Sequence, residues 1–291
     1  MADTDTELVA HALTSAHVAG GLALSGAAGW NQNEADWRLF LQLGHGFGLS
    51  TAAGELVATT MIVPFAPPRF AWISVVLVAA SHRRRGLATR LTMQALEALA
   101  ESGEVPVLDA TPQGREVYRQ LDFRDAWLLQ RLLLKGAPAS VPVAPLPGVT
   151  IRSIGASDWE RIAAYDARVF GADRRALLEA FAARLPHAAL IALRGDAVVG
   201  YLTGRDGRIA DQLGPLSADS PEIALALLQR ALAAAQNPVF IDLPERHAPV
   251  REWLAQVGFT IGRPFSRMVL GVADTFDDHA RLVLSAGPEF G

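Results

Sequence analysis

A run of basic residues is the first feature of the chain that could do chemistry. It occupies, in order, Ser81, His82, Arg83, Arg84, Arg85, Gly86, Leu87, Ala88 and Thr89. A helix that begins after Gly86 presents unpaired backbone N–H groups and the positive end of its dipole to this loop. Glycine lets an anion approach the backbone, and the guanidinium groups supply positive charge. The pattern indicates a site for phosphate or pyrophosphate.

Other interpretations of this loop are weaker. A solvated basic turn remains open, because short motifs also match by chance. A Walker loop needs Lys after its second Gly, and a dinucleotide-binding turn needs Gly-x-Gly-x-x-Gly. The loop contains neither pattern.

The loop is expected to join a buried strand to an amphipathic helix. The mainly apolar run 72–79 predicts the strand, and apolar side chains at helical spacing follow at Leu87, Leu91, Ala95 and Leu99. The next expected elements are a strand at 105–109, a helix at 114–121 and a strand at 127–134.

Glycine and proline then break the pattern over 136–148. We predict a linker at 137–148 between an N-terminal domain, 1–136, and a C-terminal domain, 149–291. After it the same order of elements recurs: a strand to about 216, a helix at 221–235, a strand at 239–243, a helix at 249–257 and a strand at 266–271. The repetition predicts two similar domains, although short segments can also match by chance.

Composition limits the partners and the compartment. The 291 residues are 51% hydrophobic and 19% charged, with a net charge of -4, so we expect a globular protein without general attraction to nucleic acid or anionic membranes. No cysteine is present and the seven histidines lack ligand spacing, so no metal is expected. The start 1–6 is acidic and the run 16–30 is too weakly apolar to span a bilayer. We therefore predict a cytoplasmic protein.

The motif Arg83-x-x-Gly86-x-Ala88, after an apolar strand and before a helix, resembles the acyl-CoA loop of the Gcn5-related N-acetyltransferase (GNAT) superfamily. The resemblance covers 27–134, and the second half resembles the C-terminal domain of tandem members. It implies an α/β fold of mixed type: two tandem domains, each with a twisted, mostly antiparallel sheet, flanking helices and a splayed strand pair.

The resemblance also implies acetyl-CoA as co-substrate and a set of contact residues. The implied cofactor-binding residues are Leu77, Val78, Arg83, Arg84, Arg85, Gly86, Leu87, Ala88 and Thr89. Tyr118 matches the tyrosine that faces the thioester sulfur in the family. Phe123 matches the end of a Gly-Phe element, but Asp122 stands where the family favours glycine.

Transfer to an amine needs an oxyanion stabiliser and an acid for the departing thiolate. A backbone N–H near Leu77 or Val78 suits the first role, and we expect Tyr118 to be the acid, with simple packing of its ring as the alternative. Asp109 precedes a Thr-Pro turn, where capping of the next helix is favoured over orienting a substrate amine. No general base is assigned.

The acceptor is expected near the aromatic and polar segment 29–37. Trp30, Asn33 and Glu34 are its candidate substrate-binding residues. Asn31 with Glu34 also fits a capping box, which is a purely structural alternative.

The second half lacks a basic loop. The corresponding segment contains Asp219 and Glu222, which would repel a pyrophosphate, and Ser220 is a good helix N-cap. We expect one acyl-CoA site per chain, with the second domain shaping the cleft or an interface.

The expected function is acetyl-CoA-dependent N-acetylation of a small primary amine or amino-acid-like metabolite by direct transfer. The alternatives are a non-catalytic acyl-CoA sensor or partner-binding protein, and a nucleotide- or phosphate-binding regulator. A homodimer stays open, and the sequence identifies neither the amine nor the preferred acyl chain.

Overall fold

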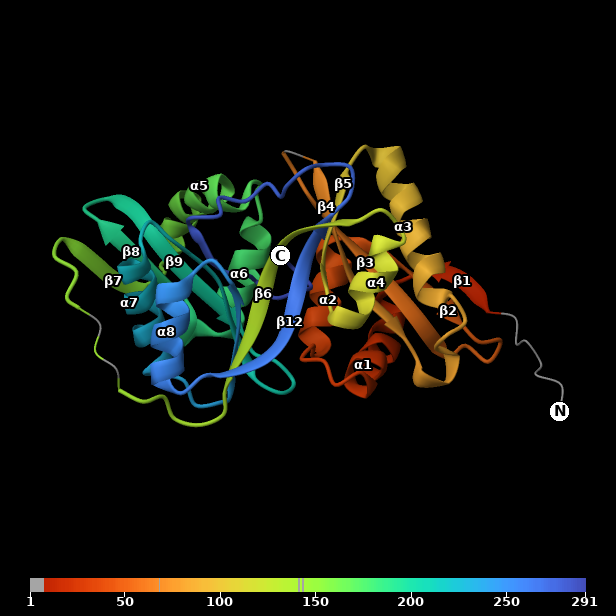
Figure 1. Cartoon of the computed structure of the whole chain (residues 1–291), viewed down its shortest axis with the longest axis horizontal. Coiled ribbons are helices and arrows are strands. Elements are labelled where there is room, and N and C mark those ends of the chain that lie inside the picture. The colour runs from red at the N-terminus through yellow and green to blue at the C-terminus, as the bar shows by residue number, and fades with distance from the viewer. Residues whose placement is uncertain (1–7, 68, 141, 143) are drawn as a thin grey trace.

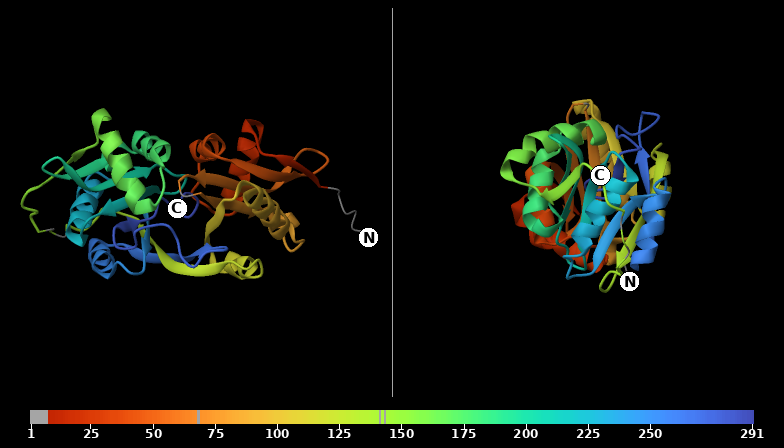
Figure 2. Two further views of the ribbon diagram at one scale, coloured as in Figure 1. Left: turned by 90° about the horizontal axis from the view of Figure 1, so that it is seen from above. Right: turned by 90° about the vertical axis from the view of Figure 1, so that its left-hand side faces the viewer.

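The computed structural model describes residues 8–67, 69–140, 142 and 144–291. Within these residues the strands form a mixed sheet of 13 strands, with helices on both faces (Figures 1 and 2). The strands of the first half are β1 (Val9–Ala12), β2 (His45–Ser50), β3 (Leu56–Phe65), β4 (Phe70–Val78), β5 (Val105–Ala110) and β6 (Arg124–Leu134). Those of the second half are β7 (Val149–Ser153), β8 (Leu190–Arg194), β9 (Ala197–Arg205), β10 (Asp211–Ala218), β11 (Val239–Pro244), β12 (Thr260–Val269) and β13 (Leu282–Leu284).

The helices repeat between the halves as the strands do. The first half has α1 (Val18–Ala27), α2 (Glu34–Leu43), α3 (Leu87–Ser102) and α4 (Pro112–Arg119), and the second has α5 (Trp159–Phe170), α6 (Arg175–Arg184), α7 (Pro221–Leu232) and α8 (Ala248–Val257). Short 3₁₀ turns lie at η1 (Ser15–His17), η2 (Ala80–His82), η3 (Ala156–Asp158) and η4 (Pro186–Ala188). Each half therefore follows one order: strand, two helices, three strands, helix, strand, helix, strand. The predicted duplication and the predicted fold class are confirmed.

The two halves exchange their last strands. The sheet order is β1-β2-β3-β4-β5-β12-β6-β11-β10-β9-β8-β7, so β12 pairs with β5 and β6 lies between β12 and β11. Figure 1 shows β6 and β12 side by side at the centre of the molecule. The segment 135–148 contains no helix or strand in its described part, but β6 before it pairs with strands that follow it. The domain limits given above stay a prediction, and the sheet itself is continuous across them.

Two strand pairs diverge, one in each half. β4 pairs with β5 only from Phe70 to Trp72, whereas β12 pairs with the other edge of β5 from Val107 to Ala110. β4 also bulges at Val75, whose φ is 41° and whose carbonyl accepts a hydrogen bond from Thr59 Oγ1 at 2.8 Å. The first half therefore has the splayed pair that the resemblance implies.

The second half fills its own divergence with protein. β10 pairs with β11 from Asp211 to Leu213, and then with the added strand β13 through Leu216 and Leu284. Ser285 N donates to the carbonyl of Asp242 on β11 at 3.1 Å. The segment 282–285 is therefore hydrogen-bonded to both β10 and β11 where these two strands diverge. Residues 282–285 thus occupy the place where the first half leaves an opening.

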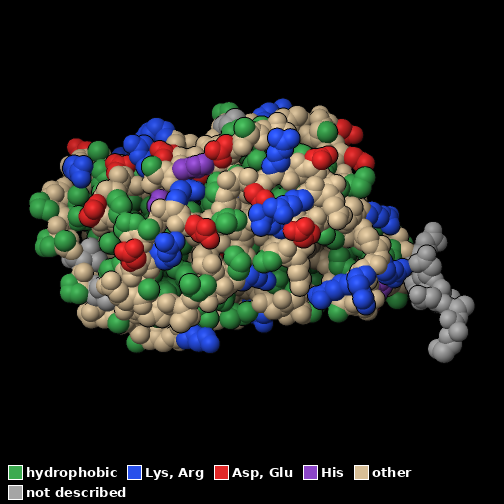
Figure 3. All heavy atoms as spheres, in the orientation of Figure 1, with side chains coloured by type: hydrophobic (Ala, Val, Ile, Leu, Met, Phe, Trp, Pro, Cys, Tyr) green, Lys and Arg blue, Asp and Glu red, His purple; other side chains and the backbone are tan. Residues whose placement is uncertain are grey.

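Apolar packing joins the halves. Phe70 of β4 lies 5.5 Å from Phe170 of α5, and Phe40 of α2 stacks on Phe290 at 4.6 Å between ring centroids. Gly291, the last residue described, lies between the two halves (Figure 1). No helix in the described residues is both long and apolar enough to cross a membrane. On the face drawn in Figure 3, acidic and basic side chains are interspersed.

The strand β13 should be a main contributor to stability. Leu284 is fully buried, so we expect Leu284→Ala to lower the free energy of unfolding by about 2–5 kcal/mol through lost contacts and a residual cavity. Leu128 on β6 is 38% exposed and is the control, with an expected loss below about 1 kcal/mol for Leu128→Ala. Urea unfolding measures the free energy of unfolding of both variants. Equal losses would contradict the expectation that β13 contributes strongly to stability.

Candidate active site

A cavity of about 830 Å³ opens where β4 leaves β5. Its walls are β4 from Ile73 to Val78, the loop at 82–89, the end of β5 and the start of α4. Residues distant in sequence complete the lining: Trp30, Asn31, Gln32, Arg131, Arg263, Phe265, Pro288 and Glu289. A second cavity, of about 910 Å³, is lined in part by residues of 137–140 and 144–149, and none of the predicted site residues lines it.

Most of the predicted cofactor-binding residues line the first cavity. They are Leu77, Val78, Arg83, Arg84, Gly86, Leu87, Ala88 and Thr89. Arg85 is not among the lining residues, in contrast to Arg83 and Arg84. Whether these residues bind a cofactor stays a prediction, but the structure brings nearly all of them to one surface.

The loop prepares the start of α3 for an anion. Gly86 is the N-cap residue with a φ of 72°, and a Cβ placed on it would meet nothing within 4 Å. Because glycine has no side-chain acceptor, the N-terminal N–H groups of α3 are not capped by the N-cap residue. By contrast, Asn33, Thr111 and Ser220 cap the helices α2, α4 and α7 with their side chains. The bare helix end and the adjacent arginines make an anion site physically favourable.

Tyr118 lies on α4 and lines the same cavity. Its ring packs edge-on against Phe123, with centroids 5.8 Å apart, so packing and access to the cavity occur together. Burial raises the pKa of Tyr118 above its ordinary value, which keeps the phenol protonated at neutral pH. A protonated hydroxyl is what a proton donor needs.

Asp109 does not cap a helix, and that prediction is wrong. Thr111 caps α4 by accepting from Gly114 N at 3.1 Å. The Asp109 carboxylate instead receives both Nε and Nη2 of Arg267, each at 2.9 Å, and both side chains are at most 1% exposed. Burial raises the pKa of Asp109, and the adjacent guanidinium opposes that shift. The sequence alone does not show this partner, because Arg267 lies 158 positions after Asp109.

The four candidate substrate-binding residues fall into two groups. Trp30 and Asp109 line the cavity, whereas Asn33 and Glu34 do not. Asn33 caps α2 and donates to Asp206 at 2.8 Å, and the side chain of Glu34 is 58% exposed in an ion pair with Arg38.

The predicted capping box is also corrected. It is formed by Asn33 with Asp36, not by Asn31 with Glu34. Asn31 instead accepts from the backbone N–H groups of Ile209 and Ala210, which fixes a loop of the second half.

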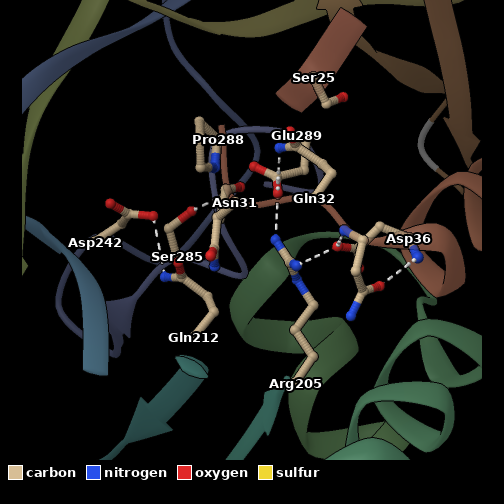
Figure 4. A network of polar contacts seen from close by, with 12 residues as sticks. Ser25, Asn31, Gln32, Asp36, Arg205, Gln212, Asp242, Ser285, Pro288 and Glu289 are labelled. Carbon is tan, nitrogen blue, oxygen red and sulfur yellow. Dashed lines mark hydrogen bonds and ion pairs between the residues drawn. The ribbon is translucent and has the colours of Figure 1, made fainter. Parts of the chain in front are cut away.

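A charged cluster, largely buried except for Asp206, borders this side of the cavity. Figure 4 labels three of its members, Asp36, Arg205 and Glu289. Arg205 is fully buried and pairs with Asp36 at 2.6 Å and with Glu289. Arg184 reaches the other oxygen of Asp36 at 2.6 Å and Asp206 at 2.7 Å. We call these five side chains the α2–β9 charge cluster.

Sequence reasoning missed four further lining residues: Gln32 and Arg131 of the first half, and Arg263 and Glu289 of the second. Arg131 and Arg263 reach the cavity because β6 and β12 are exchanged, and Glu289 reaches it because the chain returns after β13. No local pattern marks them, since their partners lie as much as 257 positions away.

The second half offers no equivalent site. Its divergence is filled by β13, and the start of α7 is capped by Ser220, which accepts from Ile223 N. Asp219 there accepts from the hydroxyl of Tyr165 at 2.9 Å. An acid where the first half has arginines, and a strand where it has a cavity, leave no place for an anionic ligand of the same shape.

Comparison with known proteins gives two matching families. An acetyltransferase (GNAT) family model matches residues 7–123, and an acetyltransferase (GNAT) domain model matches residues 162–283. The uncharacterised N-acetyltransferase YitH of Bacillus subtilis is 25% identical over 244 residues, 84% of each chain. The holothin acyltransferase of a Pseudoalteromonas strain is 25% identical over 236 residues, 79% of this chain and 76% of that protein.

Solved structures show the same fold. A proposed acetyltransferase of Pyrococcus horikoshii superposes with a TM-score of 0.77 at 21% identity, over 98% of this chain and 96% of that one. A tandem GNAT protein from the clavulanic acid biosynthesis pathway superposes with a TM-score of 0.63 at 15% identity, over 92% of this chain and all of that one.

The ion pair between Asp109 and Arg267 should hold the halves together. We expect Asp109→Ala to lower the free energy of unfolding by about 3–5 kcal/mol, because it strands a buried guanidinium. The exposed pair of Arg175 and Glu179 is the control, where Glu179→Ala should cost less than about 1 kcal/mol. Urea unfolding distinguishes the two, and a loss for Asp109→Ala no larger than the control would contradict the assignment.

Proposed function

This chain belongs to the GNAT superfamily, with two of its domains in tandem, and on that premise we propose that it is an acetyl-CoA-dependent N-acetyltransferase. The acceptor is a small primary amine or an amino-acid-like metabolite, and the acyl group passes to it directly. The observation that carries the proposal is the single cavity wall that joins the bare start of α3, the bulged edge of β4 and Tyr118.

The loop and β4 account for cofactor binding. The N–H groups at the start of α3, with Arg83 and Arg84, suit the pyrophosphate of coenzyme A. Beyond Trp72 the edge of β4 that faces β5 is no longer paired with it, so backbone groups near Leu77 could bind an amide-containing arm. The carbonyl of Val78 accepts a hydrogen bond from Arg83 Nε at 3.3 Å, so binding there would replace this contact. Cofactor binding of this kind requires only backbone groups and arginines, so it needs neither cysteine nor a metal ion.

Tyr118 and β4 account for the chemistry. A backbone N–H of β4 would stabilise negative charge on the thioester oxygen, and Tyr118 would donate its proton to the sulfur as it leaves. The raised pKa of Tyr118 makes full proton transfer to a thiolate of ordinary pKa, about 8.5, unfavourable in water. In the cavity, desolvation would raise the pKa of the departing thiol as well, which makes transfer of the Tyr118 proton to the sulfur more favourable.

A non-catalytic acyl-CoA sensor or partner-binding protein is the alternative. It would use the same loop but would not need the hydroxyl of Tyr118. One relative is named as a holothin acyltransferase, so acyl donors other than acetyl-CoA belong in any activity test.

Binding of acetyl-CoA should depend on Gly86. In calorimetric titration we expect one site per chain, weakened at least tenfold by Gly86→Glu, because the new carboxylate would repel the pyrophosphate and occupy its space. Gly103 ends the same helix with the same φ of 72° and equally open surroundings, so Gly103→Glu is the matched control. If Gly86→Glu bound as tightly as Gly103→Glu, the loop assignment would be wrong.

Turnover should depend on the hydroxyl of Tyr118. We expect Tyr118→Phe to lower kcat at least tenfold with little change in the KM for acetyl-CoA, consistent with the ~10²–10⁴-fold typical of positioned acids. Because the pKa of Tyr118 is raised, the wild-type rate should not decline at alkaline pH until above the ordinary phenol value of about 10.

Tyr165→Phe, in the second half, is the control for this substitution. A Tyr118→Phe enzyme within twofold of wild type across the pH series would remove the acid role. A protein that binds acetyl-CoA but acetylates no amine would favour the sensor.

A further inference from the structure

The chain after β13 crosses from the second half into the cavity of the first. Pro288 accepts a hydrogen bond at its carbonyl from Trp72 Nε1 of β4 at 3.1 Å, and Pro288 and Glu289 both line the cavity. Phe290 anchors the same segment by stacking on Phe40 of α2. Residues 285–290 therefore form part of the first half's site although they belong to the second.

Two oxygen atoms in this region lack partners. Gln32 Nε2 donates to Glu289 Oε1 at 2.9 Å, and Arg205 pairs with that same oxygen (Figure 4). Glu289 Oε2 and Gln32 Oε1 are buried and accept no hydrogen bond from any described residue. Both side chains are 3% exposed and line the cavity.

The missing partner must be a donor. A carboxylate only accepts, so the contact with Glu289 fixes the orientation of the Gln32 amide and makes its free atom an acceptor. A buried acceptor without a donor is energetically unfavourable. Two such acceptors, on side chains that are hydrogen-bonded to each other, favour a group with several N–H donors and no acceptor.

The surrounding charge favours a cation. The α2–β9 charge cluster contains three carboxylates, Asp36, Asp206 and Glu289, against two guanidinium groups, Arg184 and Arg205. One carboxylate is in excess when the half-exposed Asp206 is counted, and Arg205 divides its charge between Asp36 and Glu289. Of the other arginines that line the cavity on this side, Arg131 is already paired with Asp242 at 2.7 Å, whereas Arg263 is exposed and stacks on Phe265.

We infer that Glu289 and Gln32 bind the amino group of the acceptor, as a primary alkylammonium ion, at the wall of the first half's cavity. This inference rests on the proposed function and names the acceptor class: a primary amine that is cationic at neutral pH. Glu289 is a specificity-determining residue here, because its carboxylate binds the cationic form of the acceptor and takes no part in the acyl transfer. Glu289 of the second half and Gln32 of the first thus contribute the acceptor contact, and the first half contributes the acyl-donor contact.

The test uses the whole chain without acetyl-CoA and n-butylammonium as probe. Saturation-transfer NMR should detect saturable binding of n-butylammonium and at least tenfold weaker binding of neutral 1-butanol. Glu289→Gln should weaken the binding of n-butylammonium at least tenfold and leave the binding of 1-butanol unchanged. Glu179→Gln, which removes an exposed carboxylate of α6, is the matched control and should bind as wild type does.

A second variant guards against loss of the fold, because Glu289→Gln removes a charge that faces buried Arg205. Gln32→Leu keeps that ion pair and should weaken n-butylammonium severalfold. The inference is overturned if wild type does not prefer the ammonium, if a folded Glu289→Gln protein binds it as wild type does, or if Glu289→Gln unfolds and folded Gln32→Leu is unchanged. An ordered water that satisfies both oxygens would give the first of these results.

Calorimetry with acetyl-CoA on the same samples separates the two levels of the account. Ammonium preference without acetyl-CoA binding would mean that the proposed function fails while the cation site stands. Acetyl-CoA binding without ammonium preference would mean that only this inference fails.

Discussion

Two parallel strands that diverge leave backbone N–H and C=O groups unpaired on their facing edges, and buried groups of this kind must find partners. Both halves of this chain meet that constraint, because β4 leaves β5 after Trp72 and β10 leaves β11 after Leu213. The first half meets it with an open cavity that a ligand can enter. The second half meets it with β13, a strand of its own chain.

The different solutions explain why a duplicated fold has a single candidate site. In the first half a glycine N-cap and neighbouring arginines leave the start of α3 ready for an anion. In the second half Ser220 satisfies the start of α7, and Asp219 adds negative charge beside it. β13 occupies the divergence of the second half, and the residues after it, 285–290, continue to the cavity of the first half. The strand that closes one divergence therefore also positions part of the cavity wall at the other.

The sequence could predict what is local. The loop at 81–89, the helix after it and the repeated order of elements follow from spacing and residue type, whereas Leu77, Val78 and Tyr118 follow from the family resemblance. The structure places all but Arg85 of the predicted cofactor-binding residues around one cavity. The sequence also predicts some of the helix N-caps. Ser220 caps α7 as expected, whereas Asn33 and not Asn31 caps α2. A shift of two residues is enough to move a side chain to another face.

The sequence could not predict what depends on the exchange of strands. Asp109 reads as a turn residue until β12 places Arg267 opposite it, and Glu289 reads as an unremarkable acid near the end of the chain. The cavity lining from Arg131, Arg263 and Glu289 has the same origin. Pairings across more than a hundred positions carry no local periodicity, so only the assembled sheet reveals them.

The central claim is that one divergence binds the acyl donor and the other is filled by the chain. Amide hydrogen exchange with and without acetyl-CoA tests it most directly, because it reports on both places in one experiment. The account predicts slower exchange at 75–89 on addition of acetyl-CoA, and unchanged exchange at 213–220 and 282–285. Protection at the second divergence, or none at the first, would contradict it.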